Sequence, residues 1–213
     1  MADVLGVDQN YDLVTQYGFA FRHKFIFQKF STDFPSHTLY QSNNAKAVRS
    51  VIDGIITKNS IRYITAMGHG MYAAFTGQNG AIVWDAAEDL SYLKGTIVHL
   101  LSCQTGASLG RKMVADGVSA FWGYTVNFAF RHEGQPPTEL SDDTTAAIYL
   151  RMDAIIDRGI LAGKKSQPIY DSVQSYVARV IPQLTPADRA TLLDNYVHLV
   201  CPSTTWGSPS VTL

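Results

Sequence analysis

The segment YITAMGHG, residues 63–70, ends an apolar run abruptly at a histidine between two glycines. The run that leads into it, IRYITAM, has little polar alternation, which is typical of a strand buried on both faces of a sheet. His69 at the end of such a strand is a core residue, a metal ligand or a catalytic base. A second chemical group elsewhere in the chain is needed to choose among these roles.

A second apolar strand supplies that group. The segment TIVHLLSC, residues 96–103, ends in Cys103. Strands that alternate with helices predict an α/β fold with a mostly parallel sheet and helices on both faces, and such sheets bind and react at the carboxyl ends of their strands. Paired strands lie about 4.8 Å apart. If these two strands pair, His69 and Cys103 share one cleft.

The rest of the sequence is expected to complete a single domain, residues 1–213. Residues 1–12 are expected to form a loose N-terminal tail, and Gln78-Asn79-Gly80 is a hairpin signal. Further strands are expected at residues 18–30, 36–41, 118–125 and 196–200. Helices are expected after Asn43-Asn44, over residues 85–93, over 106–117 and from Thr144 to Leu161. A further helix is expected to end near Ile181, and the last one to begin at Pro186. Residues 131–143 are expected to form a loop.

Charge and cysteine content exclude several classes of protein. The formal net charge is −1 without a block of like charges, so the electrostatic footprint of a nucleic-acid-binding protein is absent. No apolar stretch reaches the roughly 20 residues that span a bilayer, and the N-terminus does not resemble a signal peptide. The two cysteines, Cys103 and Cys201, are too few for a disulfide framework. We expect a cytoplasmic protein that needs no cofactor and binds neither nucleic acid nor membrane.

His69 and Cys103 together suggest nucleophilic catalysis, because a thiol needs a base in reach or a partner that lowers its pKa. Gly70 leaves room beside a reacting carbonyl, and the backbone N–H groups of Gly70 and Cys103 are suited to hold an oxyanion. A helix expected to begin near Gly106 would favour the thiolate form of Cys103.

The same residues carry a resemblance to the caspase-like cysteine peptidases of clan CD. ITAMGHG, residues 64–70, resembles the strand-Gly-His-Gly segment of the bacterial CHAT branch, and LLSCQTG, residues 100–106, resembles its Cys-x-Thr-Gly segment. GVSAFWGYT, residues 117–125, resembles the strand after the post-cysteine helix. The resemblance implies the caspase-hemoglobinase fold, with His69 as base or proton donor, Cys103 as nucleophile and Gly70 as oxyanion donor. It also implies cleavage of a polypeptide after a chosen P1 residue, and a bacterial effector or defence protein as substrate.

Candidate substrate-binding residues follow the strand at 118–125: Trp122, Tyr124, Asp142, Asp143 and the loop 127–143. The two aspartates either select a basic P1 residue or cap the next helix, and capping is the favoured role. Arg131 would instead select an acidic P1 residue. We expect a basic or small apolar P1, and the loop 131–143 is a candidate for self-cleavage.

Other roles have less support in the sequence. His69 and Cys103 would give a metal only two ligands, and no third stands at a recognisable spacing. A Gly-x-Ser-x-Gly elbow and a phosphate-cradling glycine loop are both absent. His99 is expected to be a hydrogen-bonded core residue and Cys201 an inert buried thiol, while His132 is a weaker third candidate for the site. The alternative function is a catalytically silent caspase-like module that binds a regulatory partner in a signalling complex.

Overall fold

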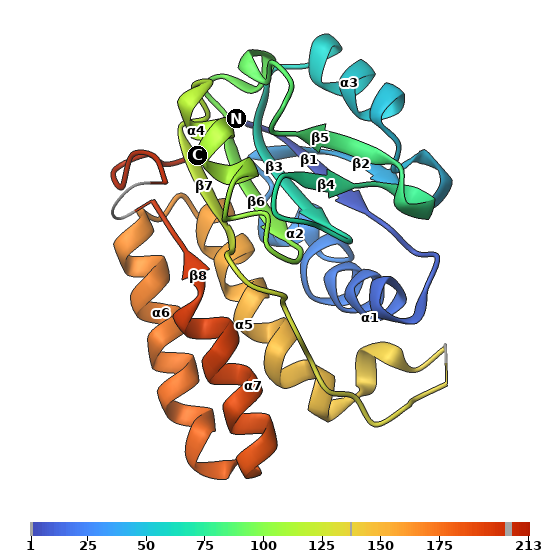
Figure 1. The fold of residues 1–213 in the computed structure, drawn as a ribbon, viewed down its shortest axis with the longest axis vertical. Helices are drawn as coiled ribbons and strands as arrows, with labels where there is room; N and C mark the ends of the chain where they lie inside the picture. The colour runs from blue at the N-terminus through green and yellow to red at the C-terminus, as the bar shows by residue number, and fades with distance from the viewer. Residues whose placement is uncertain (1, 137, 203–205) are drawn as a thin grey trace.

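A central sheet of six strands organises the computed structural model, which describes residues 2–136, 138–202 and 206–213 (Figure 1). The strand order is β2-β1-β3-β6-β7-β8, and only β8 runs antiparallel to its neighbour. The strands are β1 (Ala2–Asp8), β2 (His37–Asn43), β3 (Ile61–Met67), β6 (Ile97–Leu101), β7 (Ala120–Tyr124) and β8 (Leu199–Val200). The expected mostly parallel α/β fold is therefore confirmed.

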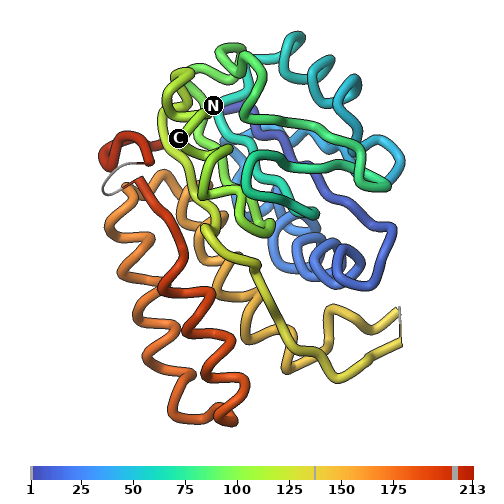
Figure 2. The backbone as a smooth tube through the Cα atoms, viewed as in Figure 1, coloured from blue at the N-terminus to red at the C-terminus, as the bar shows by residue number. Residues whose placement is uncertain are grey.

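Helices cover both faces of this sheet, as Figures 1 and 2 show. One face packs against α1 (Leu13–Arg22), α2 (Phe30–Asp33), α5 (Thr144–Leu161) and α6 (Ser166–Val180), with α7 (Pro186–Val197) beside α6. The other face packs against α3 (Arg49–Lys58), α4 (Leu109–Ala115) and the hairpin of β4 (Ala74–Thr76) and β5 (Ile82–Asp85).

Short helical turns connect these elements. A π-helical turn, His23–Phe27, follows α1 directly. The 3₁₀ turns are Asn44–Lys46, Gln78–Gly80, Ser91–Leu93, Leu140–Asp142 and Ile181–Gln183. The expected hairpin turn at Gln78-Asn79-Gly80 is confirmed, with Asn79 and Gly80 both at positive φ.

Strands β3 and β6 are buried on both faces, as their unbroken apolar sequences predict. Met67 and Leu101 face the side of the sheet that α1 and α5 cover. Ile64 and Val98 face the opposite side, towards α3 and α4. Polar side chains are thereby excluded from most of these strands, and chemistry is left to the residues just beyond their ends.

The expectation of a loose tail at residues 1–12 is wrong, because Ala2–Asp8 form β1, an inner strand between β2 and β3. Val4 and Leu5 point to opposite faces of the sheet and are fully buried in the two cores. The residues after β1 then run directly into the N-terminal cap of α1. The first twelve residues are therefore part of the framework.

The expectation of a strand at residues 18–30 is also wrong, because this segment is helical. Its aromatic residues suit a strand by propensity, but Tyr17 and Phe21, one helical turn apart, bury their rings between the sheet and α5. The helix expected after Asn43-Asn44 begins only at Arg49, because Asn44 adopts a positive φ of 53° in a 3₁₀ turn. The expected helix 85–93 is reduced to the 3₁₀ turn Ser91–Leu93.

The C-terminal helices agree better with expectation. Asp143 caps α5 by accepting from the Ala146 N–H at 2.8 Å, and Pro186 occupies the first turn of α7. No helix among the described residues is long and apolar enough to cross a membrane.

Candidate active site

Strands β3 and β6 pair in parallel and end at the same edge of the sheet. Met67 is opposite Leu101, and beyond the last pair the Gly68 N–H donates to the Leu101 carbonyl at 3.3 Å. His69 and Cys103 each follow two residues after these strand ends, and both line one small cavity of about 30 Å³. The prediction that these two residues share a cleft is confirmed.

Gly70 is required where the two strand ends meet. A Cβ atom on this residue would lie 2.5 Å from the Cys103 carbonyl oxygen, so any side chain would push the loops apart. Gln104, directly after the cysteine, has a positive φ of 58°. Its N–H donates to the Val126 carbonyl at 2.9 Å, which ties the cysteine turn to the segment after β7. The cysteine is thus presented on a sharp, anchored turn.

The histidine turn is held by Gln9, at the end of β1. Its side-chain oxygen accepts from the His69 N–H at 3.3 Å, and its side-chain amide donates to the Thr76 carbonyl. Gly68 is needed because a Cβ there would overlap this glutamine amide. Thr76 in turn donates its N–H and its hydroxyl to the His69 carbonyl, both at 3.0 Å.

Asp12 contacts the imidazole of His69 directly, with 2.5 Å between Asp12 Oδ2 and His69 Nε2. The side chains are 38% and 39% exposed, so the pair is at the surface. Burial alone would raise the pKa of Asp12, but hydrogen bonds from the Thr15 N–H and from His69 bring it below its ordinary value. An ionised carboxylate only accepts, so Nε2 carries a proton and Nδ1 is the nitrogen that can accept one.

Asp12 is not among the site residues that the sequence predicts, because residues 1–12 are expected to form a loose tail. The available signal was an aspartate before an apolar helical pattern, with Thr15 three residues later. In the structure, Asp12 is the N-cap of α1 and forms a reciprocal capping box with Thr15. The same carboxylate therefore begins a helix and orients the histidine.

Cys103 is partly buried, and its Sγ donates to the Phe128 carbonyl oxygen at 3.8 Å. Burial raises the pKa of this thiol above its ordinary value. The expectation that a helix near Gly106 stabilises the thiolate is wrong, because α4 begins only at Leu109. At neutral pH the resting side chain is a thiol.

The predicted substrate-binding roles of Trp122 and Tyr124 are wrong in this structure, because β7 is an inner strand of the sheet. Trp122 is 1% exposed and Tyr124 is fully buried, with its hydroxyl donating to Asp153 at 3.0 Å. Neither side chain lines the cavity beside Cys103.

Asp142 and Asp143 also lie away from that cavity. Asp143 caps α5 and accepts from the Tyr17 hydroxyl at 2.8 Å, so the favoured capping role is confirmed. Asp142 is exposed and pairs with Lys24. Arg131 Nη1 lies 3.6 Å from the carboxylate of Asp188 on α7, so the charge of Arg131 is paired with that of Asp188.

Part of the predicted loop 127–143 does reach the cavity. Phe128 and Phe130 line it, and Ala129 between them is fixed by the side chain of Asn195 on α7. The Ala129 N–H donates to Asn195 Oδ1 at 3.1 Å, and Asn195 Nδ2 donates to the Ala129 carbonyl at 2.7 Å. This two-point contact resembles strand pairing and sets the two phenylalanines on the same side. His132, the weaker third candidate, does not line the cavity.

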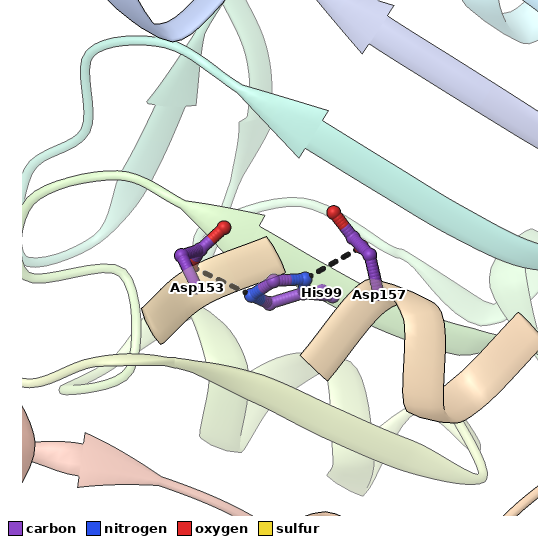
Figure 3. Close-up of side chains that lie close together, drawn as sticks. All are labelled: His99, Asp153 and Asp157. Atoms are coloured by element: carbon purple, nitrogen blue, oxygen red, sulfur yellow. Dashed lines mark hydrogen bonds and ion pairs between the residues drawn. The ribbon is translucent and has the colours of Figure 1, made fainter. Parts of the chain in front are cut away.

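Beneath the site, His99 lies between two carboxylates of α5, as Figure 3 shows. Its Nδ1 is 2.8 Å from Asp157 and its Nε2 is 3.1 Å from Asp153. Burial lowers the pKa of His99, but the charges of Asp153 and Asp157 raise it to about 9. With this pKa the imidazole is protonated at neutral pH, so both of its ring nitrogens donate to the carboxylates. The three side chains are also close enough together to surround a metal ion. The expected hydrogen-bonded core role of His99 is confirmed.

Arg22 of α1 extends this buried group to the first strand. Its guanidinium lies 2.6 Å from Asp8 on β1 and 2.7 Å from Asp157 on α5. Tyr63 on β3 also donates to Asp157. Five elements, β1, β3, β6, α1 and α5, are thereby joined by charged hydrogen bonds directly below the cavity.

At the level of sequence, no family profile and no characterised protein matches this chain. Among solved structures, it is similar to the Arg-specific cysteine proteinase gingipain R, with a TM-score of 0.58 and 12% identity over 99% of this chain. The complex of the pro- and mature domains of Porphyromonas gingivalis RgpB gives a TM-score of 0.56 and 11% identity, again over 99% of this chain. The chain spans 47% and 48% of those two chains. At this level of identity the similarity concerns the fold, and the chain therefore has the caspase-like α/β fold found in gingipain R.

Proposed function

We propose that this protein is a cysteine endopeptidase that cleaves a polypeptide through Cys103 and His69. The observation that carries the proposal is the shared cavity at the ends of β3 and β6, with Asp12 behind the histidine. The fold similarity to two structures of a cysteine proteinase supports the same class of reaction. The local likeness of both strand ends to the CHAT branch supports a bacterial effector or defence protein as the substrate.

The reaction begins from a thiol, because burial keeps the pKa of Cys103 above its ordinary value. His69 Nδ1 takes the proton of Cys103 as Sγ attacks the carbonyl carbon of the peptide bond. His69 then gives this proton to the leaving amine, and the C–N bond breaks to leave a thioester. Water attacks the thioester, which releases the acid and restores the thiol. Asp12 acts as a positioning residue, because it holds Nε2–H and leaves Nδ1 as the nitrogen that can accept a proton.

The N–H groups of Gly70 and Cys103 are proposed to hold the oxyanion. Neither has a hydrogen-bond acceptor among the described residues, although both lie in otherwise well-bonded turns. Two such donors fixed by the backbone stabilise the tetrahedral intermediate without reorganisation. Because Gly70 has no Cβ, its backbone can lie close to the Cys103 carbonyl, where a side chain would clash.

An alternative is a catalytically silent module that binds a regulatory partner. The observation in its favour is the resting state of Cys103, a thiol of raised pKa whose Sγ contacts the Phe128 carbonyl. A polypeptide partner is consistent with either function, since one of the similar structures is a complex with a pro-domain. Self-cleavage at residues 131–143 belongs only to the peptidase proposal.

A peptidyl chloromethyl ketone and a casein-derived peptide library separate the two functions. For a peptidase, the probe labels Cys103, and both Cys103→Ala and His69→Ala lower the rate of cleavage on the order of 10³-fold or more. Cys201→Ser and His198→Ala are the matched controls and keep full activity. A probe that labels Cys103 equally in the His69→Ala variant, with no cleavage of the library, would support the silent module.

A further inference from the structure

The cavity beside Cys103 has walls from three separate parts of the fold. Val14, Thr15 and Gly18 of α1 form one side. Phe128 and Phe130 form the other side. Met67, Leu101 and Leu150 are contributed by β3, β6 and α5, and all three are almost fully buried. The cavity is therefore closed towards the core and bounded at the sheet edge by the catalytic candidates.

The lining of the cavity has no acidic, lysine or arginine side chain that could pair with a charged side chain of a substrate. Among the described residues, the twelve that line it include no Asp, Glu, Lys or Arg. Asp12 contacts two of the lining residues, His69 and Thr15, but it does not itself line the cavity and is already engaged by both. Asp142 and Asp143 are engaged by Lys24 and by the N-terminus of α5. A charged group placed in such a cavity would lose its hydration without gaining a partner.

The two hydroxyl groups of the lining are also used. Thr15 Oγ1 donates to Asp12 within the capping box, 2.8 Å from Asp12 Oδ1. Ser102 Oγ lies 2.8 Å from Thr105 Oγ1. Thr15 Oγ1 also accepts from the N–H groups of Tyr11 and Asp12, so it has no capacity left for a bound side chain, and Ser102 Oγ is already held by Thr105. An unmet polar group in the cavity would be unfavourable.

The size of the cavity limits the side chain further. Its volume of about 30 Å³ is far below the roughly 150 Å³ of an apolar cavity that holds benzene. A methyl group fits this space, whereas a branched or aromatic side chain requires the lining to move. Leu150 and Met67 set the inner limit, because both are buried and packed in the core.

We propose that this cavity is the P1 pocket and that it selects a small apolar residue, alanine before valine or leucine. The proposal rests on the proposed peptidase function and adds its substrate class. The exposure of Val14 supports this proposal, because Val14 lines the cavity and is 50% exposed. An apolar substrate residue would cover the Val14 side chain on binding. Leu150 is then a specificity-determining residue at the closed end of the pocket.

Fluorogenic peptides that vary only at P1 test the preference. We expect kcat/KM to be highest for alanine, lower for valine and leucine, and at least about 100-fold lower for arginine, lysine and aspartate. A preference for a charged or amide P1 residue would overturn the pocket assignment while leaving the peptidase function intact. If no peptide is cleaved and Cys103 is not labelled in a His69-dependent way, the peptidase function fails and the pocket proposal fails with it.

The variant Leu150→Ala tests the wall itself. Removing three carbons from the closed end should raise the leucine-to-alanine ratio of kcat/KM by about tenfold. Leu161→Ala, on the same helix and equally buried but outside the cavity, is the matched control and should leave the ratio unchanged. An unchanged ratio in active Leu150→Ala, or an equal change in the control, contradicts the assignment. If Leu150→Ala does not fold, the P1 series on the unaltered protein still decides.

Discussion

The substitution Asp12→Asn separates the two roles of this side chain. Asparagine is as good an N-cap as aspartate, so we expect the free energy of unfolding to change by less than about 0.5 kcal/mol. The substitution removes the negative charge of Asp12, whose Oδ2 lies 2.5 Å from His69 Nε2. A charge-assisted hydrogen bond is roughly twice as strong as a neutral one, and its loss also frees the imidazole to rotate or change tautomer.

The size of the effect follows from the exposure of the pair. A buried carboxylate behind a catalytic histidine is worth up to about 10⁴-fold in rate, but these side chains are 38% and 39% exposed and solvent screens them. We therefore expect a loss of about 30-fold, or about 2 kcal/mol in activation free energy. The loss should appear in kcat and leave KM unchanged, because Asp12 positions the histidine and does not line the cavity.

The assay is steady-state cleavage of the best fluorogenic peptide, with urea unfolding measured in parallel. Asp12→Ser is a second variant, because serine keeps a cap for α1 but is too short to reach His69. Asp194→Asn is the matched control, because it removes the charge from another surface His–Asp pair. In that pair, Asp194 of α7 lies 3.3 Å from His198. A kcat within threefold of the unaltered protein in Asp12→Asn, or an equal loss in Asp194→Asn, would refute the reasoning.

Three further predictions concern the strand ends and the layer below them. Gly70→Ala should lower kcat/KM by more than about 100-fold, because its Cβ would lie 2.5 Å from the Cys103 carbonyl and separate the oxyanion donors; an active variant with unchanged Tm would contradict this. In a Cys201→Ser background, iodoacetamide should modify Cys103 at a rate that is still rising above pH 9, because burial raises the thiol pKa; a plateau by pH 7 would indicate a preformed thiolate. The folded-state pKa of His99, about 9, exceeds the ordinary value of 6.5, so its contribution to stability is complete below about pH 6.5 and is lost as pH rises through about 9. Urea unfolding should show a decline of roughly 3 kcal/mol over this window that is absent in His99→Gln, and parallel pH profiles for the two proteins would argue against it.

Local sequence patterns are enough to predict the sheet edge on which the site is built. An apolar strand that stops at Gly-His-Gly and another that stops at Cys are local patterns, and their burial on both faces follows directly from composition. Parallel pairing with the expected connection then brings His69 and Cys103 to one edge. The cap of α5 at Asp143 is another local signal that could be predicted, because the aspartate and the N–H groups it binds lie within one turn.

The residues that surround this edge come from distant parts of the chain and depend on how the helices pack. The segment 18–30 has the aromatic content of a strand, but packing between the sheet and α5 makes it a helix, since β propensity is weaker than burial. Asp12 lies 57 residues before His69, and Leu150 lies 47 residues after Cys103 (150 − 103), so no local spacing links them. His69 and Cys103 are positioned by strand ends, which short-range sequence patterns encode. The carboxylate of Asp12 and the shape of the pocket depend on contacts between distant segments, and these contacts exist only after the chain has folded.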